Sequence, residues 1–188
     1  MSLRLLTSLI AVGLSSCATS STETQASAQP PSEEVAKLET KTLNFEVEIA
    51  APVEAVWETM LDQEAYRQWT APFSAGSYFE GSWAEGERMR FLGPGENGMV
   101  AEIAVNRPHE VLSIRHLGFI LEGVEDTTSK EVRSWAPAYE TYRFAPTSGG
   151  TMLSIEQDVI AVYEEFMNQI WPKALAELKT LCEEGSAE

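Results

Sequence analysis

The stretch FEVEIAAPVEAVWETMLDQEAYRQW, residues 45–69, changes from strand periodicity to helix periodicity within a few residues. Phe45, Val47 and Ile49 alternate with polar residues, as in a strand with one buried face. Pro52 suits a first helical turn, and apolar residues then recur at helical spacing, namely Val53, Val56, Trp57 and Met60. A second short helix is expected over residues 63–68, ending at Trp69. The pattern therefore predicts one strand followed by two short helices.

Glycine and proline divide the middle of the chain into short segments that are typical of strands. The segments expected to be strands are residues 77–83, 87–92, 99–106, 110–121 and 138–160, the last containing a hairpin turn at Ser148-Gly149-Gly150. Short connections of this kind predict an antiparallel sheet throughout. Residues 163–183 then form a long helix with one apolar stripe, made of Phe166, Met167, Ile170, Trp171, Ala174, Leu175, Leu178 and Leu181.

This order of elements predicts an α+β domain over residues 41–188 with a helix-grip fold. In that fold a curved antiparallel sheet wraps around a long C-terminal helix, and two short helices follow the first strand. The chain resembles the START-related SRPBCC superfamily through three stretches: FEVEIAAPVEAVWETMLDQEAYRQW, GTMLSIEQDV and IWPKALAELKTL. The branch it resembles most is named after activators of the ninety-kilodalton heat-shock protein ATPase. The resemblance runs from Phe45 to Leu181, and it implies a deep cavity for lipids, sterols, polyketides or other apolar molecules.

Residues 1–16 have the layout of a bacterial secretion signal, with one basic residue, Arg4, before an apolar run too short to span a membrane. Leu14-Ser15-Ser16-Cys17 resembles the lipobox, in which the cysteine is lipidated and becomes the first residue after cleavage. Two other interpretations are a plain secretion signal and a buried N-terminal helix, each with a chance cysteine. Residues 17–40, rich in Ser, Thr, Gln and Pro, are expected to be a disordered tether.

The lipobox implies a lipoprotein in the cell envelope of a Gram-negative-type bacterium. Ala18 follows the cysteine, where an Asp typically retains lipoproteins at the inner membrane, so the outer membrane facing the periplasm is the expected location. The formal net charge of −16 disfavours nucleic acid and anionic lipid head groups as partners. Membrane contact is therefore expected through the lipid anchor only.

Cofactor and metal sites are not predicted. The second cysteine, Cys182, has no partner for a disulfide once Cys17 is lipidated, and it is expected to lie in the core. The two histidines, His109 and His116, lack the neighbours typical of a structural zinc site. The chain has no GxSxG, P-loop, HExxH or GxGxxG motif, so no catalytic residue is predicted.

Candidate ligand-binding residues follow from alternation along the predicted strands. Three polar residues are in phase with apolar ones expected to face inward: His116 with Leu112 and Ile114, Glu140 with Tyr142 and Phe144, and Gln157 with Leu153 and Ile155. A register change of one residue would instead place all three in water. The apolar candidates for the wall, each of which could equally be ordinary core, are Trp69, Phe73, Tyr78, Phe91, Trp135, Phe166 and Ile170, with Tyr142 beside the polar three.

Three functions fit these observations. The first is a membrane-tethered domain that binds a small apolar or amphipathic ligand in an internal cavity. The second is an enzyme, cyclase-like or hydrolase-like, that uses the same cavity, with His116 as the first residue to suspect. The third is a co-chaperone that activates an ATPase, which export from the cytoplasm disfavours.

Overall fold

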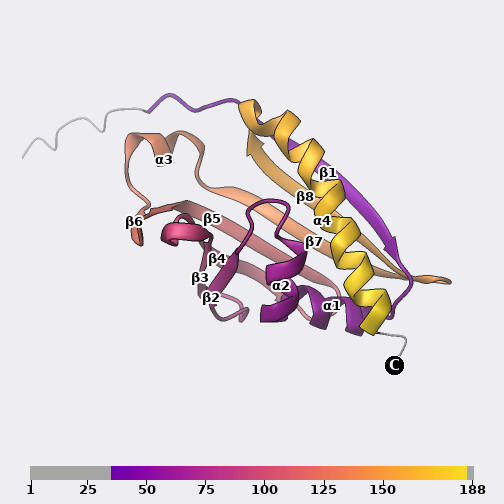
Figure 1. The fold of residues 1–188 in the computed structure, drawn as a ribbon. Coiled ribbons are helices and arrows are strands. Elements are labelled where there is room, and N and C mark those ends of the chain that lie inside the picture. The colour runs from indigo at the N-terminus through magenta and orange to yellow at the C-terminus, as the bar shows by residue number, and fades with distance from the viewer. Residues whose placement is uncertain (1–34, 186–188) are drawn as a thin grey trace, which may run out of the picture. The chain divides into compact units, whose positions relative to one another are not determined.

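The strands of the domain form one antiparallel sheet in a computed structural model, which is described here over residues 35–185. The strands are β1 (Thr40–Ile49), β2 (Tyr78–Gly81), β3 (Arg88–Leu92), β4 (Gly98–Arg107), β5 (Val111–Leu121), β6 (Val124–Asp126), β7 (Ala138–Thr147) and β8 (Gly150–Ile160). Their order is β1-β8-β7-β5-β4-β3-β2, with β6 paired to β5 (Figure 1). The predicted signal, Cys17 and most of the predicted tether lie outside the described residues.

The helices are α1 (Val53–Leu61), α2 (Gln63–Trp69), α3 (Lys130–Trp135) and α4 (Glu164–Gly185), with short 3-10 turns η1 (Pro94–Glu96) and η2 (Ala161–Tyr163). α1, α2 and α4 lie on one side of this sheet, and α3 lies apart from them beside β5 (Figure 1). α4 packs against β1, α1 and α2. The predicted helix-grip fold is therefore confirmed, including the two short helices after the first strand. None of the helices within residues 35–185 is long and apolar enough to cross a membrane.

Local sequence explains where the two short helices separate. Asp62 ends α1 and caps α2, because its carboxylate accepts hydrogen bonds from the backbone N–H groups of Glu64 (2.9 Å) and Ala65 (2.8 Å). At the other end of α2, the Trp69 indole N–H donates to the Met60 carbonyl of α1 (3.1 Å). These bonds fix α2 beside α1, and the Tyr66 ring of α2 then packs against Phe79 and Phe91 of the sheet.

The buried stripe of α4 is shorter than its apolar pattern predicts. The buried residues are Trp171, Ala174, Leu175, Leu178 and Cys182. Phe166, two turns earlier than Ala174, is 47% exposed, so the prediction that it faces the interior is wrong. The helix periodicity is correct, but no residue before Trp171 is buried in α4.

The β7–β8 hairpin packs tightly against the corner between β1 and α1. Gly150 is the first residue of β8 and pairs with Thr147 of β7, which confirms the predicted hairpin turn. The φ angle of Gly150 is +144°. A Cβ atom at Gly150 would lie 2.1 Å from the Ile49 carbonyl oxygen. Next to it, the buried Thr151 hydroxyl donates to the Ala51 carbonyl (2.7 Å). Only glycine leaves room for this contact between two backbone segments.

Two irregularities in the β4–β5 pairing change which residues face the helices. The register shifts between Val100 and Ala101 on β4, so that Val100 pairs with Gly118 but Ala101 with His116. Such a bulge bends a strand and changes the face to which its side chains point. Ile120 accordingly packs in a separate small cluster with Leu92 and Val100, away from the main core.

Candidate functional site

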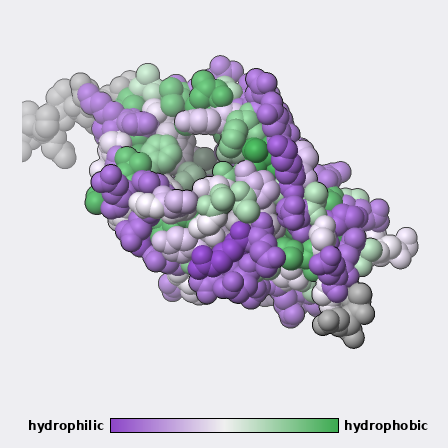
Figure 2. All heavy atoms as spheres, viewed as in Figure 1, coloured by the Kyte–Doolittle hydropathy of each residue, from purple (hydrophilic) through white to green (hydrophobic). Residues whose placement is uncertain are grey.

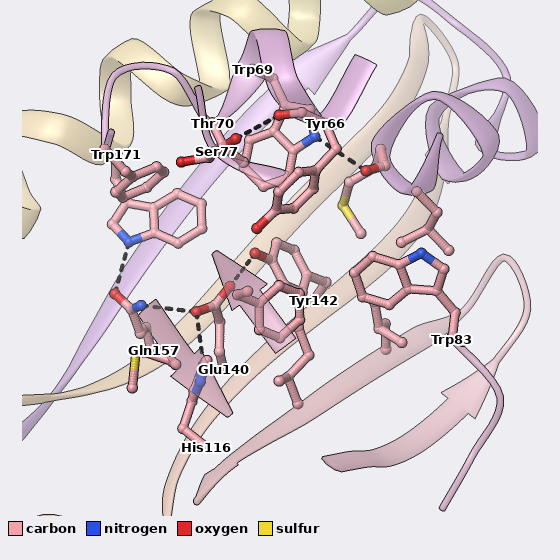
Figure 3. A pocket seen from close by; sticks show the side chains of 17 residues that line it. Tyr66, Trp69, Thr70, Ser77, Trp83, His116, Glu140, Tyr142, Gln157 and Trp171 are labelled. Atoms are coloured by element: carbon pink, nitrogen blue, oxygen red, sulfur yellow. Dashed lines mark hydrogen bonds and ion pairs between the residues drawn. The ribbon is translucent and has the colours of Figure 1, made fainter. Parts of the chain in front are cut away.

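A cavity of about 150 Å³ lies among α1, α2, α4 and the sheet (Figure 3). Seventeen residues line it: Met60, Leu61, Tyr66, Trp69, Thr70, Phe73, Ser77, Trp83, Phe91, Met99, Leu112, Ile114, His116, Glu140, Tyr142, Gln157 and Trp171. On the face seen in Figure 2, hydrophobic residues border a hollow in the molecular surface. A cavity of about 150 Å³ is large enough for benzene, so this volume suits a ligand of about one ring.

The polar groups of the cavity meet at the carboxylate of Glu140. Its Oε2 lies 3.3 Å from His116 Nε2 and accepts a hydrogen bond from Gln157 Nε2 (2.9 Å). Its Oε1 accepts a hydrogen bond from the Tyr142 hydroxyl. Gln157 Oε1 in turn accepts from the Trp171 indole N–H (2.8 Å), which connects the sheet to α4 (Figure 3). Four elements, β5, β7, β8 and α4, therefore hold one hydrogen-bonded network.

The strand register explains why these side chains meet. Glu140 on β7 lies directly opposite Ile114 on β5 and Gln157 on β8. His116 is two residues beyond Ile114, so it shares the same face and is a diagonal neighbour of Glu140. A sequence pattern shows that each residue alternates with apolar neighbours, whereas only the register shows that all three converge.

Glu140 is held as a carboxylate inside the protein. Burial acts to raise its pKa, but the hydrogen bond and the electrostatic attraction of His116, with hydrogen bonds from Tyr142 and Gln157, outweigh burial and hold the pKa below its ordinary value. Its side chain is only 13% exposed. Within residues 35–185 no lysine or arginine forms an ion pair with it.

Two tyrosines border this carboxylate and remain protonated. Burial, followed by the charge of Glu140, raises the pKa of both Tyr66 and Tyr142 well above the ordinary tyrosine value. Tyr142 uses its proton to bond Glu140. Tyr66 comes from α2 and points its hydroxyl toward Tyr142 across the cavity (Figure 3).

Two buried nitrogens on the cavity wall have no hydrogen-bond partner within the described part of the chain. They are Nδ1 of His116 and Nε1 of Trp83. Buried polar atoms are normally paired, and an unpaired one in a cavity is a position where a ligand or water can bond. The cavity therefore offers free hydrogen-bonding capacity beside its aromatic walls.

The structure brings seven of the eleven predicted ligand-binding residues to this cavity: Trp69, Phe73, Phe91, His116, Glu140, Tyr142 and Gln157. The other four do not line it. Tyr78 packs beside the small cluster around Ile120, with the Arg67 guanidinium over its ring. Trp135 lies in α3 and packs against Phe119.

Phe166 and Ile170, the remaining two, lie on α4 before its first buried residue, Trp171. Their placement in the cavity was predicted from one continuous apolar stripe, and this prediction is wrong because the stripe is buried only from Trp171 onward.

Ten of the seventeen wall residues were not among the predicted candidates, and three of these ten are aromatic: Tyr66, Trp83 and Trp171. Tyr66 lies three residues before Trp69 in a short helix, and this spacing already indicates a shared face. Trp171 belonged to the predicted stripe of α4. Trp83 follows β2 outside any regular element, so no periodicity indicates its direction.

Among residues 35–185 no three His, Cys, Asp or Glu side chains are grouped so that they could hold a metal ion. Cys182 is buried in the core, and burial raises the pKa of its thiol to about 11.

Comparison with known proteins agrees with this architecture. A sequence model of the family described as "Activator of Hsp90 ATPase homolog 1-like protein" matches residues 50–183. The chain is similar to protein MLL2253 from Mesorhizobium loti, with 18% identity and a TM-score of 0.59 over 75% of this chain and 96% of that one. It is also similar to protein NE0264 from Nitrosomonas europaea, with 16% identity and a TM-score of 0.61 over 78% and 97%.

A third similar structure is the Aha1 dimer from Colwellia psychrerythraea, determined in solution. Its identity is 15% and its TM-score 0.59, over 76% of this chain and 96% of that one. At these identities the likeness concerns the fold alone. The comparison with curated proteins gave no match.

Proposed function

The chain belongs to the family of Activator of Hsp90 ATPase homolog 1-like proteins, and on this premise we propose that it binds a small apolar or amphipathic molecule in its internal cavity. The observation that carries the proposal is the cavity itself, which combines aromatic and aliphatic walls with a polar network around Glu140. Ligand sites in proteins are typically concave and mostly apolar, with a few placed polar groups that orient the ligand.

Binding is tested by titrating the protein with small ring compounds such as benzyl alcohol. Three tryptophans line the cavity, Trp69, Trp83 and Trp171, so occupancy should change intrinsic fluorescence. Met99→Trp adds volume at the wall and should abolish binding, whereas Met152→Trp adds the same side chain on β8 away from the cavity. Equal binding by both variants would show that the ligand does not use this cavity.

A second candidate function is an enzyme that uses the same cavity. The specific observation in its favour is a buried carboxylate, Glu140, next to two titratable groups, His116 and Tyr66. Groups with shifted pKa values in a cavity are typical of catalytic sites, although structural networks also shift them. Native mass spectrometry of protein purified from its source membrane separates the two functions. A molecule recovered unchanged after incubation indicates binding, and one recovered with altered mass indicates turnover.

We further propose that the domain is attached to a membrane by lipidation of Cys17. Acyl chains are the strong membrane attachment that the sequence offers, since the chain is acidic. Cys17→Ser should release the protein or trap its precursor, which membrane fractionation detects. A processed Cys17→Ser protein of unchanged mass in the membrane fraction would overturn this part of the proposal, and export would then lose its support.

A further inference from the structure

The carboxylate of Glu140 lacks a permanently charged partner. Its side chain is almost completely buried, and the ion pair available to it within the described residues is with His116. Taking a carboxylate out of water is costly unless a cation or several hydrogen bonds compensate. The three hydrogen bonds to Glu140 hold the ionised form, but they add no positive charge unless His116 is protonated.

His116 uses one of its two ring nitrogens in the contact with Glu140. Its Nε2 faces the Glu140 carboxylate at 3.3 Å, so the proton of a neutral ring belongs on that nitrogen. Its Nδ1 is buried and has no partner within residues 35–185. That nitrogen is therefore open to a ligand. No lysine or arginine of residues 35–185 forms an ion pair with Glu140, so no permanently charged side chain in this part of the chain balances the carboxylate.

Aromatic rings surround the remaining space. The wall contains seven Phe, Tyr and Trp residues: Tyr66, Trp69, Phe73, Trp83, Phe91, Tyr142 and Trp171. Several of their rings are neighbours: the Tyr66 and Phe91 centroids lie 6.2 Å apart, and those of Trp83 and Phe91 5.8 Å apart. The faces of aromatic rings attract cations, most strongly where water is excluded. A carboxylate beside several rings is a combination that suits an organic cation.

We propose that the ligand of this cavity is a small organic cation, either a protonated amine or an alkylammonium group, with a size of about one ring. The inference deepens the proposed function and rests on it. The cation would lie between the Glu140 carboxylate and the aromatic rings and would add the permanent positive charge that no lysine or arginine of residues 35–185 supplies there. The formal net charge of −16 acts in the same direction, because an acidic protein raises the local concentration of cations.

Two hydrogen-bonding groups of the cavity wall indicate which functional groups the ligand carries. The Tyr66 hydroxyl points into the cavity (Figure 3) and is able to accept a hydrogen bond from an ammonium N–H. The indole N–H of Trp83 is a donor without a partner among the described residues, so it suits an oxygen atom elsewhere on the ligand. An amino alcohol satisfies both groups, whereas its fully methylated form keeps the charge and the oxygen but has no N–H to donate to Tyr66.

The test compares choline with 3,3-dimethyl-1-butanol, which has the same shape and the same hydroxyl but a carbon in place of the charged nitrogen. Calorimetric titration of the wild-type protein should give a Kd about tenfold lower for choline. Glu140→Gln should reduce this ratio to about one while leaving the Kd of the alcohol within about twofold. Glu156→Gln removes one negative charge from an exposed position on β8 and should leave the ratio unchanged.

The outcomes separate the inference from the proposed function. If the alcohol binds as tightly as choline, the inference fails and the proposed function stands. If choline, the alcohol and benzyl alcohol all fail to bind, both fail. If the ratio of the two Kd values drops equally in Glu140→Gln and Glu156→Gln, the preference for choline comes from the overall charge of the protein, and the inference of a cation site at Glu140 fails. The wild-type comparison needs no variant, so it decides the question even if Glu140→Gln does not fold.

Discussion

Gly150→Ala tests whether the contact between the β7–β8 hairpin and the β1–α1 corner holds the domain together. The φ of +144° at Gly150 is a conformation that essentially only glycine adopts. The added Cβ would also lie 2.1 Å from the Ile49 carbonyl oxygen and 2.8 Å from the Ala51 nitrogen. Both are backbone atoms, so no side-chain rotation relieves the overlap and the two segments have to separate.

The expected cost follows from two contributions. Forcing alanine into this backbone conformation costs about 1–3 kcal/mol. Separating the segments also breaks the buried bond from the Thr151 hydroxyl to the Ala51 carbonyl, which contributes about 0.5–1.5 kcal/mol. The free energy of unfolding should therefore fall by about 1.5–4.5 kcal/mol, and the melting temperature of a domain this size by roughly 3–18 °C.

Thermal and urea unfolding of Gly150→Ala and Gly149→Ala measure this effect. Gly149 is the adjacent residue of the same turn, and a Cβ there would lie 3.4 Å from a Glu48 side-chain oxygen, an ordinary contact. Gly149→Ala should change stability by less than about 1 kcal/mol. If the two variants lose the same stability, the close approach of the backbones at Gly150 is not what stabilises the corner, and the reasoning is refuted.

Three further predictions concern α4 and the cavity. Phe166→Ala should lower the free energy of unfolding by about 1 kcal/mol or less, because Phe166 is half exposed. Trp171→Ala should lower it by about 3–5 kcal/mol, because Trp171 is buried. Equal losses in urea unfolding would contradict the conclusion that the buried stripe of α4 begins at Trp171. The pKa of Glu140 is lowered in the folded state, so its stabilisation is present above the ordinary value of about 4.3 and is lost as pH falls through the folded value. Between pH 6 and pH 3 the free energy of unfolding of Glu140→Gln should therefore fall less than that of the wild type. If the two plots of unfolding free energy against pH run parallel, the ionised Glu140 does not stabilise the fold. Cys182 in a Cys17→Ser chain should not react with a disulfide reagent at pH 8, because its pKa is raised to about 11 and it is buried; rapid labelling of the folded protein would contradict this.

The fold was predictable because its main elements have strong local patterns. Alternation up to Ile49, the helical spacing from Val53 and the long stripe around Leu178 each extend over enough residues to define an element type. The structure confirms the strand, the two short helices and the long helix with small changes at their ends. α3 was not predicted, because its six residues are too few to show a helical period. Its one local signal is Ser129, whose hydroxyl caps the helix by accepting from the Val132 N–H (3.1 Å).

The candidate site was predictable only in part, because its assembly depends on contacts between distant segments. Alternation placed His116, Glu140 and Gln157 on one face, and the structure places all three on the cavity wall. Their convergence on one carboxylate depends on strand register, which no local pattern contains. The exposure of Phe166 likewise depends on which turns of α4 pack against other elements. Helical periodicity is the same in a turn that packs against the domain and in one that faces solvent.

The partner of β1 lies near the opposite end of the chain. Thr40 pairs with Ile160, and α4, which packs on β1, comes later still. During synthesis β1 therefore has no strand to pair with until almost the whole domain has left the ribosome. Folding that depends on such distant pairings is slow. If the chain is exported as we propose, late pairing of β1 would leave the domain unfolded for passage through a membrane, and the sheet would close after β8 has crossed.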